Sequence, residues 1–138
     1  MIKVKIQGSS YPLGEDDDIK EVSKVVVVSP EGEVLLVRRA SHMIWHPDKW
    51  DLPGGHWKKG ENGSSAAIRE LKEELGIDIE DLEEIDKAAS ITIFKAGAEK
   101  QPHYDLDDEN QEAKWFSADA LKDLDVVPNI QKYIADAL

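Results

Sequence analysis

The chain has 138 residues, a net charge of −12 and no cysteine. This length supports one domain with its own core, so we expect residues 1–138 to form a single domain. The negative charge disfavours DNA or long RNA as the main ligand, because a polyanion would be repelled. Without cysteine there are no disulfides and no thiolate catalysis, and no apolar run is long enough to cross a bilayer. We therefore expect a cytoplasmic protein with no membrane partner.

The first fifty residues contain apolar runs separated by turn signals. Residues 2–6 alternate apolar and charged side chains, as a half-exposed strand does. Residues 1–20 are expected to be an N-terminal extension or an edge strand, and could contact another subunit of a homodimer. Two apolar runs flank Pro30-Glu31-Gly32, which predicts a hairpin. In chain order we expect a loop at 11–18, strands at 25–28 and 34–37, a loop at 40–49 and a short lead-in at 50–52.

The segment from residue 62 to residue 76 has the signals of one amphipathic helix. Gly76 stands where a left-handed residue would end it. Side chains that can cap the first turn are Asn62, Ser64 and Ser65. The apolar stripe that would dock on a core consists of Ala67, Ile68, Leu71 and Leu75.

After this helix the chain is predicted to return to strands and to end in helices. In order we expect strand near Ile85 and at 90–95, a polar irregular stretch at 97–111, a short strand at 115–116, a helix begun by Ser117 and a last helix at 128–138. This mixed order of elements indicates an α/β domain.

Three carboxylates lie within one turn of the predicted helix, at Glu70, Glu73 and Glu74. Positions i, i+3 and i+4 share a helix face, where three negative charges repel one another unless something positive is bound. A divalent cation with oxygen ligands, Mg²⁺ or Mn²⁺, meets that need. Pro53-Gly54-Gly55 precedes the helix as a loop that can approach a ligand closely. Together these features predict a phosphate and metal site; the alternative is a solvated acidic helix face without a ligand.

Residues 55–77 read G-x5-E-x7-R-E-L-K-E-E-L-G-I, which resembles the Nudix box of the Nudix hydrolase family at every defined position. Residues 35–40 are similar to a strand end of MutT-type members, and the resemblance extends over about residues 24–135. It implies a Nudix-type α/β/α sandwich with a mixed central sheet and the box loop and helix at one edge. It also implies hydrolysis of a nucleoside diphosphate linked to another moiety, with Mg²⁺ as cofactor and Mn²⁺ as a substitute.

The resemblance implies roles for residues of the box. Glu73 and Glu74 correspond to the central metal ligands, and Glu70 to a further ligand or to the base that takes a proton from water. All three are therefore expected to be catalytic. The Gly54 carbonyl corresponds to a backbone metal ligand. Two residues are implied to pair and to hold the carboxylates in place, Glu61 and Arg69.

Further positions outside the box match MutT-like sequences more loosely. Arg39 would contact a substrate phosphate, or would be a surface arginine at a strand end. Glu109 corresponds to an extra metal-binding carboxylate, with Glu112 as its competitor. Asn129 could donate to and accept from a purine edge, or be a helix cap or turn residue. Trp45 and Trp50 could stack on a base, with a core role as the favoured alternative for at least Trp50.

The resemblance favours a nucleotide pyrophosphohydrolase that converts a nucleoside triphosphate, or a modified one, to a monophosphate and pyrophosphate. The alternatives are a nucleotide-sugar or ADP-ribose pyrophosphatase, and a non-catalytic module that senses a nucleotide and binds a partner. The span between Gly76 and Trp115 is shorter than in MutT-like sequences and lacks their aromatic-rich paired strands, so we expect an altered surface beneath the base.

Overall fold

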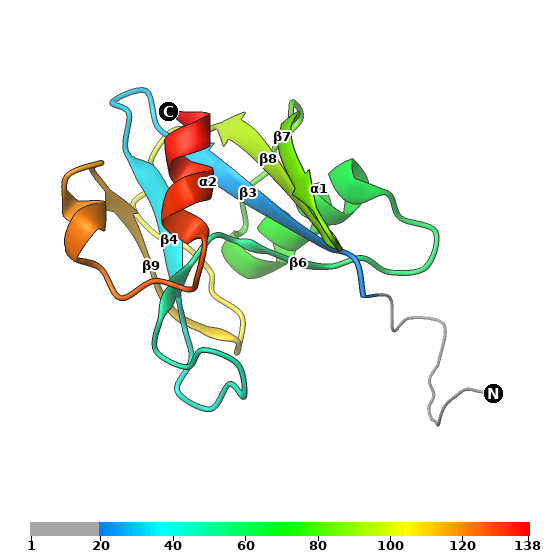
Figure 1. Cartoon of the computed structure of the whole chain (residues 1–138), viewed down its shortest axis with the longest axis horizontal. Helices are drawn as coiled ribbons and strands as arrows, with labels where there is room; N and C mark the ends of the chain where they lie inside the picture. Colours follow the sequence, from blue (N-terminus) through cyan, green and yellow to red (C-terminus); the bar gives the residue numbers. More distant parts are fainter. Residues whose placement is uncertain (1–19) are drawn as a thin grey trace.

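The computed structural model describes residues 20–138. The strand predicted at 2–6, the loop at 11–18 and nearly all of the extension at 1–20 lie outside the described residues. The elements, labelled as in Figure 1, are β3 (Val22–Val28), β4 (Val34–Arg39), β5 (Trp50–Asp51), β6 (Gly54–His56), α1 (Gly63–Leu75), β7 (Glu83–Ala88), β8 (Ile91–Gly97), β9 (Asn110–Phe116), a 3-10 helix (Ala120–Asp123) and α2 (Ile130–Ala137). No helix in this described part is long and apolar enough to span a membrane.

The strands form one mixed sheet with the order β5-β4-β3-β8-β7, to which β6 adds beside β3 and β9 beside β4. β3 runs parallel to β8, whereas the other pairings are antiparallel. Only the end of β3 pairs with β4, because its first residues pair with β6 instead. Because of this exchange of partners, Gly54 of β6 pairs with Lys24 of β3, the central strand of the sheet.

Both faces of the sheet are covered, which confirms the predicted α/β/α sandwich. Alternate residues of β3 point to opposite faces: Val25 and Val27 belong to the core beneath α1, and Val26 belongs to the core beneath α2. A strand buried on both faces reads as a continuous apolar run, as residues 25–28 do. Figure 1 shows α2 on the near side of the sheet and α1 on the far side.

The signals in the sequence account for both ends of α1. The Asn62 side chain accepts a hydrogen bond from the Ser65 amide at 2.9 Å, and the Ser65 hydroxyl accepts one from the Asn62 amide at 3.0 Å. This reciprocal capping box satisfies amides that have no partner within the helix. Gly76 ends the helix in the left-handed region, with φ 69°. Ala67, Leu71 and Leu75 are buried against the sheet, as their spacing predicts.

The second half of the chain departs from the prediction in its strands. Residues 110–111 belong to β9 and are not irregular, and β9 has seven residues where only 115–116 were predicted. The sequence predicted strand β7 only near Ile85. Four of its six residues are charged, because it lies at the edge of the sheet, and so its apolar pattern is weak. β7 and β8 form a hairpin through Ala89, which has φ 53°.

Two helix predictions near the C-terminus need correction. Ser117 begins no α-helix: its hydroxyl accepts from the Ala120 amide at 3.2 Å, and a single 3-10 turn follows. The last helix starts at Ile130 rather than at Pro128. Asn129 has φ 74°, a left-handed conformation that a helical residue does not adopt.

Candidate active site

A cavity of about 470 Å³ opens where β3, β4, the 40–49 loop and the glycine turn meet the end of α1. Each of these segments contributes at least one chemically useful group to the wall. The groups are Lys24 from β3, Arg39 from β4, Trp45 from the loop, Gly54 from the turn and Glu74 from α1. This volume lies within the range of pockets that hold small organic ligands.

Glu74 is a buried carboxylate of the site, with 5% of its surface exposed. One oxygen accepts from the Gly54 amide at 2.7 Å, and the other accepts from the Asn110 side-chain amide at 2.9 Å. Burial raises the pKa of Glu74 to about 8, despite these two hydrogen bonds. A carboxyl group held this way favours a neutral state until a positive charge binds beside it.

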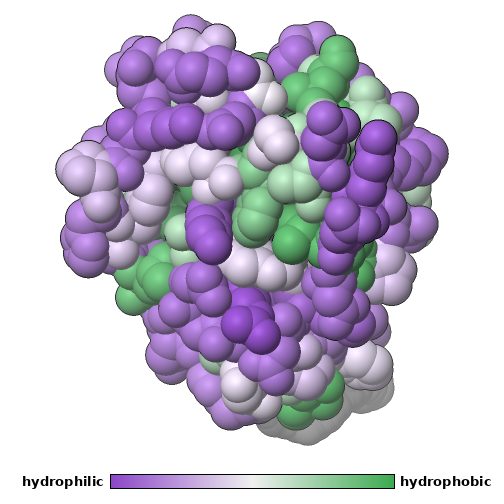
Figure 2. Space-filling view, turned by 90° about the vertical axis from the view of Figure 1, so that its left-hand side faces the viewer, coloured by the Kyte–Doolittle hydropathy of each residue, from purple (hydrophilic) through white to green (hydrophobic). Residues whose placement is uncertain are grey.

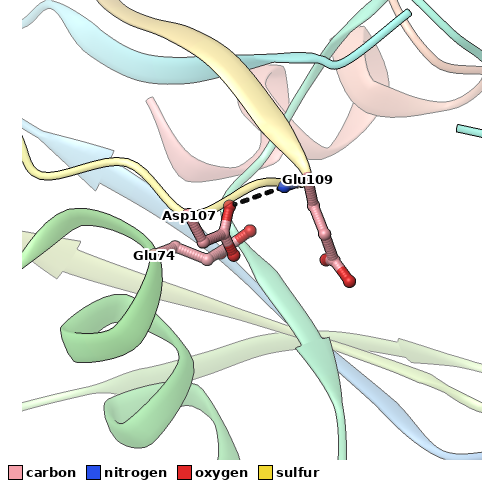
Figure 3. Close-up of side chains that lie close together, drawn as sticks. All are labelled: Glu74, Asp107 and Glu109. Atoms are coloured by element: carbon pink, nitrogen blue, oxygen red, sulfur yellow. Dashed lines mark hydrogen bonds between the residues drawn. The ribbon is translucent and has the colours of Figure 1, made fainter. Parts of the chain in front are cut away.

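Two further carboxylates approach Glu74 from the segment before β9. One oxygen from each of Glu74, Asp107 and Glu109 lies within 4.8 Å of the others. Figure 3 shows Glu74 projecting from the end of α1 toward Asp107, with Glu109 on the same loop. The Glu109 amide donates to Asp107 at 3.2 Å, and the Asn110 side chain donates to Asp107 at 3.1 Å. The chain therefore folds three carboxylates toward one point from elements more than thirty residues apart.

Glu70 lies against the glycine turn. A Cβ atom added to Gly55 would meet a Glu70 carboxylate oxygen at 1.5 Å, so only glycine leaves room for this carboxylate. Burial raises the pKa of Glu70, and the charges of Glu73 and Glu109 act in the same direction. Glu73 is more open, with 49% of its side chain exposed. The negative charges of Glu73, on the same helix, and of Glu109, on the loop before β9, thus both act on Glu70.

Arg69 joins the acids of the box. Its Nε lies 2.6 Å from Glu61 Oε2, and its Nη1 lies 3.1 Å from Glu70 and 3.0 Å from Glu73. A further bond, 2.9 Å long, runs from its Nη2 to the His56 carbonyl. The hydrogen bond from Arg69 holds the pKa of Glu61 below its ordinary value. Arg69 therefore ties the start of the box loop to the acidic face of α1.

Arg39 lines the cavity next to a buried ion pair that the sequence did not suggest. Lys24 Nζ lies 2.5 Å from Asp51 Oδ2, and Arg39 Nη1 lies 3.7 Å from the same oxygen. Only 4% of the Asp51 side chain is exposed. Two cations share one carboxylate here, so this wall of the cavity keeps an excess of positive charge. The available signals were a lysine directly before the apolar run 25–28 and an aspartate between Trp50 and Leu52.

The structure separates Glu109 from its competitor. Glu109 lines the cavity, whereas Glu112 pairs with Arg38 at 3.4 Å. Asn129 is exposed, its side chain caps nothing, and it is not among the residues that line the cavity, although Val127 is. A role for Asn129 at a purine edge stays a prediction.

Sequence reasoning missed Asp107 and Asn110. Both lie in the stretch that was predicted to be irregular, where acids and amides are so dense that none stands out. Asn110 is buried, with 7% of its surface exposed, because it begins β9 opposite Arg39.

The donor set fits a hard divalent cation. The carboxylates that the structure groups together, Glu74, Asp107 and Glu109, all offer oxygen. The predicted ligands Glu70 and Glu73 and the Gly54 carbonyl are not in this group, but they would offer oxygen as well. Mg²⁺ and Mn²⁺ prefer oxygen ligands, and no sulfur donor or histidine belongs to this group. Burial raises the pKa of Glu70 and of Glu74, so a cation bound beside them would favour their ionised forms.

Comparison with known proteins assigns this arrangement to a family. The NUDIX domain profile matches residues 20–137. The chain belongs to the Nudix family. Its fold agrees with that assignment: the crystal structure of the MutT NUDIX hydrolase from Burkholderia pseudomallei superposes with a TM-score of 0.71 at 22% identity, over 85% of this chain and 96% of that one.

Two curated Nudix relatives resemble the chain in sequence. The RNA pyrophosphohydrolase of Hahella chejuensis is 32% identical over 101 residues, which are 72% of this chain and 59% of the relative. The NAD-capped RNA hydrolase NudC of Pseudomonas aeruginosa is 28% identical over 120 residues, 83% of this chain and 42% of the relative. The Nudix domain described here thus spans about half the length of these relatives.

Proposed function

We propose that this Nudix domain is a Mg²⁺-dependent pyrophosphohydrolase whose substrate is a nucleoside triphosphate, or a modified one, which it converts to a monophosphate and pyrophosphate. One observation supports the proposal most strongly. The cavity has an acidic end, lined by Glu74 and Glu109, and a basic wall formed by Lys24 and Arg39. A metal-bound polyphosphate needs both kinds of wall.

The residues of the chain divide the chemistry between them. A bound divalent cation would neutralise phosphate charge and lower the pKa of water. The Gly54 amide fixes the Glu74 carboxylate, and Arg39 offers its guanidinium to a phosphate. Glu70, with its pKa raised by burial, is suited to take the proton from the attacking water. Water oxygen bonds to phosphorus, the bridging P–O bond breaks, and pyrophosphate leaves.

The names of the relatives favour one competing substrate, the 5′ end of an RNA chain. The charge of the chain opposes this alternative. At −12, the chain repels a long polyanion, whereas a small nucleotide meets mainly the local field of Lys24 and Arg39. Nucleotide sugars and ADP-ribose also carry a diphosphate that could contact the acidic end, through a cation, and the basic wall of the cavity. They are therefore included in the same test.

A substrate panel tests the proposal. Canonical and modified nucleoside triphosphates, nucleotide sugars, ADP-ribose, dinucleoside polyphosphates and a 5′-triphosphorylated RNA oligonucleotide are incubated with the chain and Mg²⁺, and released phosphate and pyrophosphate are measured. We expect the highest kcat/KM with a triphosphate, no turnover in chelator, and a loss of at least about 100-fold in Glu73→Gln.

The matched control is Glu83→Gln, which removes the same charge from an exposed position on β7 and should leave activity unchanged. Preference for the RNA oligonucleotide would contradict the proposed substrate. Tight nucleotide binding without any turnover would identify a sensing module instead.

A further inference from the structure

The 40–49 loop carries two large apolar side chains in water. Ile44 is 88% exposed and Trp45 is 72% exposed. Of these two neighbours, Trp45 lines the cavity of the active site, together with Met43 and His46, and Ile44 does not. On the face drawn in Figure 2, apolar areas lie at the centre and toward the upper right, between hydrophilic side chains. Trp45 is therefore an exposed aromatic side chain at the wall of the cavity.

Hydrogen bonds hold this loop in place. The Trp45 carbonyl accepts from Arg39 Nε at 2.7 Å. Asp48, three residues later, accepts through its side chain from Ser41 and from Gln111, each at 2.7 Å. Gln111 belongs to β9, so the loop is fastened to the sheet as well as to itself. The backbone of Trp45 is therefore fixed before any ligand arrives.

We propose that Trp45 is a stacking platform for the base of the nucleotide substrate. The inference rests on the proposed function and adds the element that recognises the base. An indole ring offers a flat apolar face on which any base can stack, and such stacking contributes affinity without reading base identity. A broad preference among bases follows from this geometry.

The position of Trp45 relative to the phosphate groups supports a base as the occupant. Arg39 holds the Trp45 carbonyl with Nε, while its Nη1 lies 3.7 Å from Asp51 in the cavity. A single side chain thus links the basic wall to the aromatic residue. In a nucleotide, a base is separated from its phosphates by one sugar, so a ligand with phosphates at Arg39 carries its base into the region of Trp45. Val127 completes the apolar lining.

The test compares Trp45→Ala and Trp45→Phe with Ile44→Ala, a matched control that removes a neighbouring apolar side chain outside the cavity. Each protein is assayed with ATP, GTP and inorganic tripolyphosphate. We expect Trp45→Ala to raise KM for ATP and GTP about tenfold or more, with kcat unchanged, and Trp45→Phe to restore most of the affinity. Tripolyphosphate, which has no base, should bind all four proteins equally. A tripolyphosphate affinity that falls in parallel would overturn the proposal.

Binding measured without turnover separates this inference from the proposed function. Equilibrium dialysis of ATP and GTP in Ca²⁺ gives Kd for each variant. If the wild type hydrolyses none of the panel but loses nucleotide affinity with Trp45→Ala and not with Ile44→Ala, the proposed function fails and the platform stands. If the wild type hydrolyses nucleotides, and Trp45→Ala and Ile44→Ala bind them equally well, the proposed stacking role of Trp45 is wrong. A change in the sedimentation coefficient of both Trp45→Ala and Ile44→Ala would also contradict the stacking role. The loop would then be an interface between copies of the chain.

Discussion

Asn110 connects two carboxylates that arrive from different parts of the chain. Its side-chain amide donates to Glu74 at 2.9 Å and to Asp107 at 3.1 Å, and its backbone begins β9. One amide group thus sets the distance between an acid on α1 and an acid on the preceding loop. Partners that orient metal ligands commonly affect affinity as much as some ligands do.

We therefore expect Asn110→Ala to weaken Mn²⁺ binding by about 10- to 100-fold, because Glu74 and Asp107 lose their common donor. Isothermal titration of Mn²⁺ into the metal-free protein measures this directly. Lys114→Ala, at an exposed position of the same strand, is the control. Equal affinities in the two variants would show that Asn110 has no part in positioning the carboxylates.

Burial of Glu74 also predicts a pH dependence. Its pKa of about 8 in the folded protein exceeds the ordinary value of 4.5, so the folded state keeps a proton that the unfolded chain releases. The resulting stability is fully present below pH 4.5 and is lost as the pH rises toward 8. In chelator, the free energy of unfolding should fall between pH 5 and pH 8, with a contribution from this group of at most about 1.4 kcal/mol per pH unit.

Urea denaturation at pH 5, 6, 7 and 8 measures that slope. Glu74→Gln removes the titrating group while keeping the side-chain shape, so the difference between the two proteins isolates its contribution. Saturating Mg²⁺ should flatten the wild-type curve, because the cation stabilises the ionised carboxylate. Parallel curves for wild type and variant in chelator would contradict the assignment.

At the scale of elements, the two glycines of the turn before α1 have different tasks. A Cβ atom at Gly54 would meet the Ser23 carbonyl oxygen at 2.0 Å, and its φ of 145° suits only glycine. A Cβ atom at Gly55 would meet the end of a flexible side chain, Glu70, at 1.5 Å. The first clash is with the sheet itself, and the second is with Glu70, the proposed general base.

Gly54→Ala should therefore destabilise the fold by several kcal/mol, on the order of 3, because backbone strain and a backbone clash add together. Gly55→Ala should leave the midpoint of thermal unfolding nearly unchanged but displace Glu70 and lower kcat. Thermal denaturation and steady-state kinetics of both variants check the contrast. If Gly55→Ala unfolded the protein as readily as Gly54→Ala, Glu70 would be part of the packing that supports the fold.

Some elements could be predicted from the sequence because their signals are local. The capping side chains, the stripe and Gly76 delimit α1, and the apolar run at 25–28 marks a strand buried on both faces. β7 and most of β9 could not be predicted in the same way. Their residues are largely charged or half-buried, and their strand conformation depends on pairing with β8 and β4.

The same division holds for the site. The spacing of Glu70, Glu73 and Glu74 belongs to one helix, so it could be predicted from the sequence. Asp107, Asn110 and Lys24 join them only through pairings between distant segments, such as Arg39 with Asn110 and Lys24 with Gly54. No local pattern encodes those pairings.

At the scale of the whole molecule, the distribution of charge matters more than its sum. The chain carries −12 overall, yet its cavity combines carboxylates at one end with two cations on the adjacent wall. Small anions accompanied by a divalent cation can enter such a cavity, whereas the net negative charge of the chain repels longer polyanions. We therefore infer that the carboxylates around Glu74 take up a divalent cation.

Titration of Mn²⁺, with the free ion followed by electron paramagnetic resonance, tests this claim most directly. It is performed on the wild type, Glu74→Gln and the surface control Glu83→Gln, each with and without a non-hydrolysable nucleoside triphosphate. We predict uptake by the wild type and the control, tighter with the nucleotide, and an affinity at least about tenfold lower in Glu74→Gln. Absence of uptake by the wild type, or an unchanged affinity in Glu74→Gln, would contradict the account.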